Sequence, residues 1–231
     1  MDFTAAEYAQ RDAVRLREIL DGPPVTWVLI GDSITQGVEH TRGRRGYAEH
    51  FAERVRGELG RLGDAVVNTS VSGSTSEDLL AEFHWRAGRF APDVVIAMFG
   101  TNDAVEGSDG IRGYRYRIDQ IVQRARDIGA TAVLQTPPPV QPGDSREPEV
   151  VAAYAEAVRE VARDLGVLLV DHHRHWTEAG DDGGPAEWFA DPFHPSAAGH
   201  VELARALFRA LGIDDPASGV YALELEGAAR G

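Results

Sequence analysis

Five short, almost continuously apolar runs alternate along this chain with longer segments whose apolar residues recur at helical spacing. The runs are rich in β-branched residues, which is typical of strands buried on both faces of a parallel sheet. They cover residues 25–30, 65–68, 93–99, 130–135 and 167–170. Parallel strands need right-handed crossovers between them, so the pattern predicts a three-layer α/β/α sandwich with a five-stranded parallel sheet.

The segments between the runs predict amphipathic helices that pack on this sheet. The apolar spacing is clearest in three of them: residues 111–125, 151–165 and 204–211. Gly63, Gly129 and Gly166 each lie between a helical segment and the next run, where a left-handed helix cap is expected. Ser74 followed by Glu77 predicts a capping box that opens a further helix.

A chain of 231 residues is long enough for one α/β domain with a sizeable core. No internal repeat or low-complexity tract divides it, so we expect a single domain over residues 1–231. Its expected parts are a core at about 25–212, an N-terminal helix at 4–20 and a weakly patterned C-terminal tail at 214–231. Residues 220–225 of the tail have the composition of an edge strand or an oligomer contact, or else form a frayed end.

The composition excludes several classes of function. The net charge of −14 repels phosphate backbones and anionic membranes, so neither nucleic acid nor a membrane is an expected partner. The chain has no cysteine and no lysine, which excludes thiol nucleophiles, Schiff bases and a P-loop lysine. The N-terminus lacks the basic start and apolar stretch of a signal peptide, and no apolar run reaches the ~18 residues of a membrane span. We therefore expect a soluble, cytoplasmic protein.

Four polar clusters lie where ligands of an open parallel sheet bind, near the carboxyl ends of the predicted strands. The first, GDSITQG, has Ser33 on a tight turn after the first strand. The second, NTSVSGST, contains Gly73, whose backbone N–H can approach a reacting oxygen because no side chain intervenes. The third, GTND, supplies Asn102, whose side-chain amide is a donor of the kind that stabilises an oxyanion.

The fourth cluster, DPFHP, precedes the last helical segment. Asp191 and His194 are three residues apart, so the carboxylate can hold one imidazole nitrogen while the other takes a proton from a serine. Taken singly, each cluster is also explained by an ordinary turn or helix cap. Taken together and in this order, the four clusters resemble the SGNH (GDSL-type) hydrolase family over roughly residues 25–212.

The resemblance implies a flavodoxin-like SGNH fold and a site that needs neither a cofactor nor a metal ion. Ser33 would be the nucleophile, and His194 and Asp191 would complete its triad. The N–H groups of Ser33 and Gly73 and the amide of Asn102 would form the oxyanion hole. Three further residues are candidates for contact with the substrate: Asp32, Trp188 and Phe193. Core or lid packing explains the two aromatic residues equally well.

The expected partner is a small-molecule ester. Because no apolar lid segment is evident, short-chain, acetyl-type esters of a sugar or a secondary metabolite are favoured over long-chain lipids. An acyltransferase or thioesterase-like tailoring enzyme with the same triad is the alternative. A non-catalytic binding protein and a metal-dependent phosphatase are less favoured, and the oligomeric state stays open.

Two further clusters have both a structural and a functional interpretation. Three histidines follow the fifth run: His172, His173 and His175. Their spacing can bind zinc, but Asp171 is the only carboxylate beside them, which favours polar residues leaving a strand. Three arginines follow the serine loop: Arg42, Arg44 and Arg45. They could hold an acidic group of a substrate, although a solvated entrance to a helix is the favoured interpretation.

Overall fold

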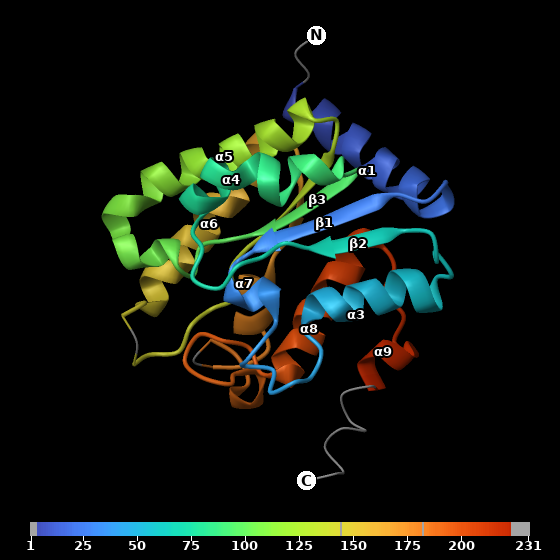
Figure 1. Ribbon diagram of the computed structural model, residues 1–231. Helices are drawn as coiled ribbons and strands as arrows, with labels where there is room; N and C mark the ends of the chain where they lie inside the picture. Colours follow the sequence, from blue (N-terminus) through green and yellow to red (C-terminus); the bar gives the residue numbers. More distant parts are fainter. Residues whose placement is uncertain (1–3, 144, 182, 223–231) are drawn as a thin grey trace.

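The computed structural model describes residues 4–143, 145–181 and 183–222. Within them, five parallel strands form one sheet in the order β2-β1-β3-β4-β5 (Figure 1). The strands are β1 (Thr26–Gly31), β2 (Ala65–Asn68), β3 (Val94–Met98), β4 (Thr131–Gln135) and β5 (Leu168–Val170). Each lies within one residue of its expected bounds, and the predicted five-stranded parallel sheet is confirmed.

Helices cover both faces of the sheet, and Figure 1 shows α4 and α5 above it and α3 and α8 below it. One face carries α4 (Ser76–Arg86), α5 (Ile111–Asp127) and α6 (Pro148–Leu165). The other carries α1 (Ala5–Asp21), α3 (Tyr47–Glu53) and α8 (Ala197–Leu211). Successive residues of a strand point to opposite faces, so Val28 of β1 joins the first core and Trp27 the second.

Shorter helical pieces complete the described fold. They are α2 (Ser33–Gln36), α7 (His172–Thr177), α9 (Gly219–Ala222), a π-helical turn over Arg54–Glu58 that extends α3, and 3₁₀ turns over Gly88–Phe90, Asp103–Glu106, Ser108–Gly110 and Ala186–Trp188. None of the helices in the described ranges combines the length and the apolar character that crossing a bilayer requires.

Two of the three predicted glycine caps are confirmed. Gly129 and Gly166 have positive φ angles of 83° and 62° at the ends of α5 and α6. Gly63 is not in the left-handed region, so that prediction is wrong. A Cβ atom there would come within 2.7 Å of the Pro24 ring, and close packing explains the glycine instead.

The predicted capping box lies one residue further along the chain. Thr75, not Ser74, is the N-cap of α4, and Asp78, not Glu77, is its partner. The hydroxyl of Ser74 instead accepts hydrogen bonds of 3.0 Å from the guanidinium of Arg86. Spacing alone does not distinguish these registers, because Ser74 precedes Glu77 by three residues just as Thr75 precedes Asp78.

The two ends of the described chain are helical. The helix expected at residues 4–20 is α1, with Thr4 as its N-cap. Residues 220–222 belong to α9 and not to an edge strand, and the side chain of Val220 is buried in the second core. The remainder of the stretch expected at 220–225 lies outside the described residues.

Candidate active site

The turn after β1 presents Ser33 at the carboxyl edge of the sheet. The carboxylate of Asp32 accepts a hydrogen bond of 2.9 Å from the N–H of Ile34, which caps the single turn of α2. A side chain on Gly31 would collide with Thr35 and with a main-chain carbonyl of β3. Only glycine therefore allows the strand to pass directly into this turn.

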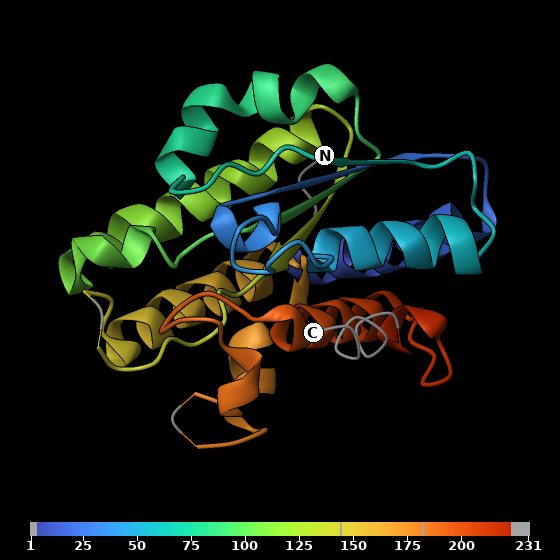
Figure 2. The same ribbon diagram turned by 60° about the horizontal axis from the view of Figure 1, so that its bottom comes forward.

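The structure brings Ser33, His194 and Asp191 together from distant parts of the chain. Oγ of Ser33 is 2.9 Å from Nε2 of His194, although the two residues are 161 positions apart. Nδ1 of His194 is 2.7 Å from Oδ2 of Asp191. Figure 2 shows the orange segment before α8, which carries Asp191 and His194, running back beside the light-blue loop that follows α2.

The carboxylate of Asp191 is held by its own loop. Its Oδ1 accepts hydrogen bonds from the N–H groups of Phe193 at 3.0 Å and of His194 at 2.8 Å. Burial raises the pKa of Asp191, but these N–H groups and the imidazole outweigh it, so the pKa lies below its ordinary value. The group is therefore an anion at neutral pH and keeps a proton on Nδ1 of His194.

The pKa of His194 lies below its ordinary value, mainly because burial disfavours the imidazolium. The hydrogen bond and charge of Asp191 raise the pKa, whereas His40 and Arg146 lower it further. At neutral pH the ring is thus neutral, and Nε2 is able to accept a proton from Ser33.

This shift gives a prediction for the pH dependence of the ester hydrolysis that the sequence leads us to expect. A general base acts only when it is deprotonated, so with His194 in the expected role of base we expect kcat/KM to fall as the pH drops through its pKa. Because that pKa is lowered, activity should persist below about pH 6.5, the ordinary value for histidine. The measurement is a pH–rate profile of kcat/KM with p-nitrophenyl acetate. An acidic limb centred above that value would contradict the assignment.

The loops that carry Asn102 and Gly73 are joined to each other. Nδ2 of Asn102 donates a hydrogen bond of 3.0 Å to the carbonyl of Ser74. The neighbouring Asp103 is fully buried and accepts from the N–H of Ser76 at 3.0 Å. Gly73 is exposed and has a φ of 80°. An amide nitrogen has two hydrogens, so Asn102 keeps one donor for a ligand.

Arg146, which belongs to none of the four sequence clusters, holds the oxygen end of the Asn102 amide. Its Nη2 donates to Oδ1 of Asn102 and its Nε to the carbonyl of Thr101, both at 3.0 Å. Its guanidinium carbon lies 3.9 Å from the centre of the Phe193 ring. Arg146 comes from the proline-rich loop before α6, and no local pattern marks an arginine in such a loop as part of a site.

His40 is a second residue that lies next to Asp191 and His194 but outside the four sequence clusters. Nδ1 of His40 lies 3.3 Å from Oδ2 of Asp191. Its ring stacks on that of His194, with 3.4 Å between centroids and 11° between planes. A single histidine in a loop of arginines and glycines is not a recognisable signal, because its contacts come from the distant segment that carries Asp191 and His194.

The three candidates for substrate contact lie in different surroundings. The ring of Phe193 is 4.1 Å from that of His194, at the edge of the site. Trp188 packs on Trp176, with 5.3 Å between ring centroids. Asp32 is 2% exposed, and burial raises its pKa to about 7. A role in the turn, and not contact with the substrate, fits the burial of Asp32.

The histidines on α7 do not converge on a common point. His172 is buried, and its Nε2 is 2.9 Å from Oε1 of Gln135. His175 instead pairs with Glu202 on α8 at 3.1 Å. These contacts agree with the favoured interpretation of the cluster, which is that its histidines are polar residues at the end of β5.

Comparisons with known proteins agree with the fold. The model of the GDSL-like lipase/acylhydrolase family matches residues 29–201. An acetylxylan esterase from Geobacillus stearothermophilus is 28% identical over 206 residues, which cover 81% of this chain and 94% of that protein. The crystal structure of that esterase has a TM-score of 0.72 and 27% identity and covers 84% of this chain and 96% of its own.

Two other relatives extend the comparison. A hydrolase from the metagenome of Lake Arreo, described as an alpha/beta hydrolase enzyme, has a TM-score of 0.72 and 25% identity, with 85% of this chain and all of its own covered. An uncharacterized lipoprotein of Bacillus subtilis, YqeF, is 28% identical over 69% of this chain and 74% of its own length.

A three-layer fold with a serine, an imidazole and a carboxylate in contact at the carboxyl edge of its sheet is that of an SGNH-type ester hydrolase. The chain belongs to the GDSL-like lipase/acylhydrolase family and is a carboxylic ester hydrolase. The resemblance predicted from its four sequence clusters is confirmed.

Proposed function

We propose that this enzyme hydrolyses short-chain, acetyl-type esters of a small polar molecule such as a sugar. The observation that carries the proposal is the continuous contact from Oγ of Ser33 through the imidazole of His194 to the carboxylate of Asp191. The likeness to an acetylxylan esterase over most of both chains supports an acetylated carbohydrate as the substrate class.

In the proposed reaction, Oγ of Ser33 attacks the ester carbonyl while Nε2 of His194 takes its proton. The N–H groups of Ser33 and Gly73 and the amide of Asn102 stabilise the negative charge on the carbonyl oxygen. The alcohol leaves with the proton from His194, and an acyl group remains on Ser33. Water, deprotonated by the same imidazole, then releases the acid and restores the serine.

A cavity near the triad supports the proposal that the alcohol portion of the ester substrate is polar. It has a volume of about 470 Å³, and its lining includes His40, whose ring stacks on that of His194. Its wall includes the cationic side chains of Arg42 and Arg44 and the carboxylate of Glu187. Such a mixture of donors and acceptors suits the hydroxyl groups of a sugar better than an alkyl chain.

The proposal is tested with two sets of esters. Against p-nitrophenyl acetate, butyrate and octanoate, kcat/KM should fall as the acyl chain lengthens, and acetylated xylo-oligosaccharides should release acetate. After rapid quenching, mass spectrometry should detect one acetyl group on the intact protein and, after digestion, should locate it on the peptide that contains Ser33. A higher kcat/KM for octanoate than for acetate would overturn the short-chain assignment, and an acyl group on any other residue would overturn the mechanism.

The contacts of Asn102 give a quantitative prediction. Removing one oxyanion donor typically costs roughly 10²–10³ in kcat, and this is the loss expected for Asn102→Ala. Arg146→Met should act through Asn102 because it frees the oxygen of that amide. In the Asn102→Ala background the second substitution should therefore add little, with a coupling of roughly 0.5–3 kcal/mol. Fully additive losses in this double-mutant cycle would show that Arg146 acts independently.

A further inference from the structure

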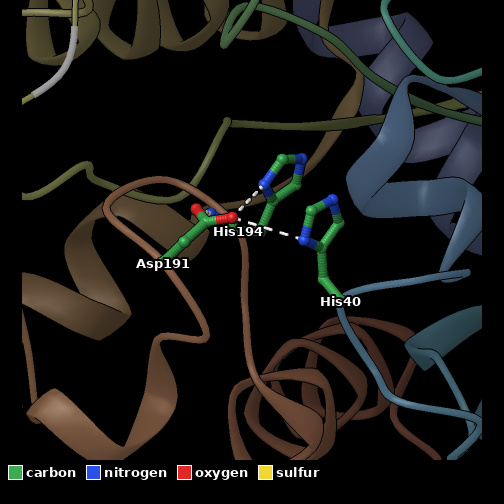
Figure 3. A group of neighbouring side chains, drawn as sticks. All are labelled: His40, Asp191 and His194. Atoms are coloured by element: carbon green, nitrogen blue, oxygen red, sulfur yellow. Dashed lines mark hydrogen bonds and ion pairs between the residues drawn. The ribbon is translucent and has the colours of Figure 1, made fainter.

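His40 is the group beside the triad that the proposed mechanism does not use. It lies on the loop between α2 and α3, and Figure 3 shows its ring alongside that of His194, with dashed lines from both rings to Asp191. Nδ1 of His40 is 3.3 Å, and Nδ1 of His194 is 2.7 Å, from the same carboxylate oxygen. Two imidazole nitrogens and one carboxylate oxygen thus meet at one point.

We propose that His40, Asp191 and His194 form a binding site for a transition-metal ion such as Zn²⁺, and that a bound ion stops ester hydrolysis. The second half of this inference rests on the catalytic role proposed for His194. The ligand atoms of the three residues all lie within 4.8 Å of one another. Two nitrogens and one carboxylate oxygen, with a fourth position left for water, are a common donor set for zinc.

The geometry needs only small adjustments to receive the ion. Two nitrogen ligands of a tetrahedral zinc ion are about 3.4 Å apart, given Zn–N distances of about 2.0–2.1 Å. The stacked rings hold their Nδ1 atoms on the same side, toward Asp191. Modest rotations of the two rings would turn these nitrogens from the carboxylate oxygen to an ion beside it.

An ion has access to this point from solvent. The side chain of Asp191 is 33% exposed and that of His40 is 26% exposed, whereas His194 is nearly buried at 9%. Water is therefore able to fill the remaining coordination position. The net charge of −14 also favours a cation over an anion at the surface.

The loop backbone near His40 includes two residues in a conformation that residues with a side chain usually avoid. Glu39 and Arg42, on either side of it, have positive φ angles of 63° and 53°. The left-handed region is uncommon for residues with a Cβ atom. The N–H of His40 also donates to the carbonyl of Val38 at 2.7 Å. This loop thus holds the imidazole against the triad instead of leaving it in solvent.

A metal on Nδ1 of His194 would disable the base. The metal takes the lone pair of Nδ1, so the remaining ring proton must be on Nε2. Nε2 then donates to Oγ of Ser33 and is unable to accept its proton. The ion would also compete with the imidazole for Asp191. Occupation of the site and ester turnover are therefore mutually exclusive.

Metal binding is tested without reference to catalysis. Titration calorimetry with ZnCl₂ on Ser33→Ala should detect one bound ion per chain. Adding His40→Phe, which keeps a ring on His194 but removes the ligand, should weaken binding by roughly 100-fold or more, because losing a supporting group alone costs 10–100-fold. His40→Gln provides a second, smaller replacement. His175→Gln is the control, since it removes the imidazole paired with Glu202 and should leave the affinity unchanged.

The effect on turnover is tested in parallel. Zn²⁺ should inhibit the unaltered enzyme, EDTA should restore it, and His40→Phe should resist inhibition relative to its own metal-free rate. The proposal is overturned by the absence of binding up to about 1 mM ZnCl₂, by an affinity in both His40 variants equal to that of Ser33→Ala alone, or by binding without inhibition. If Ser33 is not the nucleophile, the trapping experiment fails while the calorimetric result still decides the metal site.

Discussion

Replacing Ser33 with alanine should lower kcat for ester hydrolysis by roughly 10⁵- to 10⁶-fold, the scale seen when a serine nucleophile is removed from a triad. The hydroxyl of Ser33 lies 2.9 Å from Nε2 of His194, and alanine has no proton to donate in its place. We expect some acceleration over the uncatalysed reaction in water to remain, because the proposed oxyanion donors and the binding surface are still present. Release of p-nitrophenol from p-nitrophenyl acetate measures the loss.

The same substitution should also abolish labelling of the intact protein by a fluorophosphonate, which needs a nucleophilic hydroxyl. Ser70→Ala is a matched control. The hydroxyl of Ser70 is buried without a hydrogen-bond partner among the described residues, so its removal should leave both labelling and turnover in place. Retention of labelling in Ser33→Ala would show that another residue is the nucleophile.

Asp191→Asn should lower kcat by about 10⁴-fold, as the corresponding change does in serine proteases. Oδ1 of an asparagine still accepts from the N–H groups of Phe193 and His194, so the loop should keep its shape. The side-chain amide of the variant, however, donates a hydrogen bond to Nδ1 of His194, whereas the carboxylate of Asp191 accepts one from it. The ring proton then moves to Nε2, and the base is lost without any change in packing.

Two measurements distinguish this electronic effect from unfolding. The melting temperature of Asp191→Asn should stay close to that of the unaltered enzyme, while kcat falls. Asp181→Asn, an exposed change in the preceding loop, should alter neither. A variant with near-normal kcat would remove Asp191 from the triad, and the paired carboxylate would then have only a structural role.

The strands were predictable because burial on both faces of a parallel sheet leaves a continuous apolar run, as residues 94–98 illustrate. The capping box was less predictable, since Ser74 and Thr75 are both suitable N-caps and only the contact of Ser74 with Arg86 separates them. Gly63 was misinterpreted for a related reason: close packing and positive φ both demand glycine, and the sequence does not distinguish the two demands.

The sequence by itself determined the fold class, the family and the four clusters that carry Ser33, Gly73, Asn102 and His194. These signals are local, because a strand, a turn and a short motif each depend on residues that are near neighbours in the chain. Tertiary structure alone decided that Arg146 holds the Asn102 amide and that His40 stacks on His194. Those contacts join loops that follow different strands, so their partners are set by the packing of the whole sheet and not by any pattern along the chain.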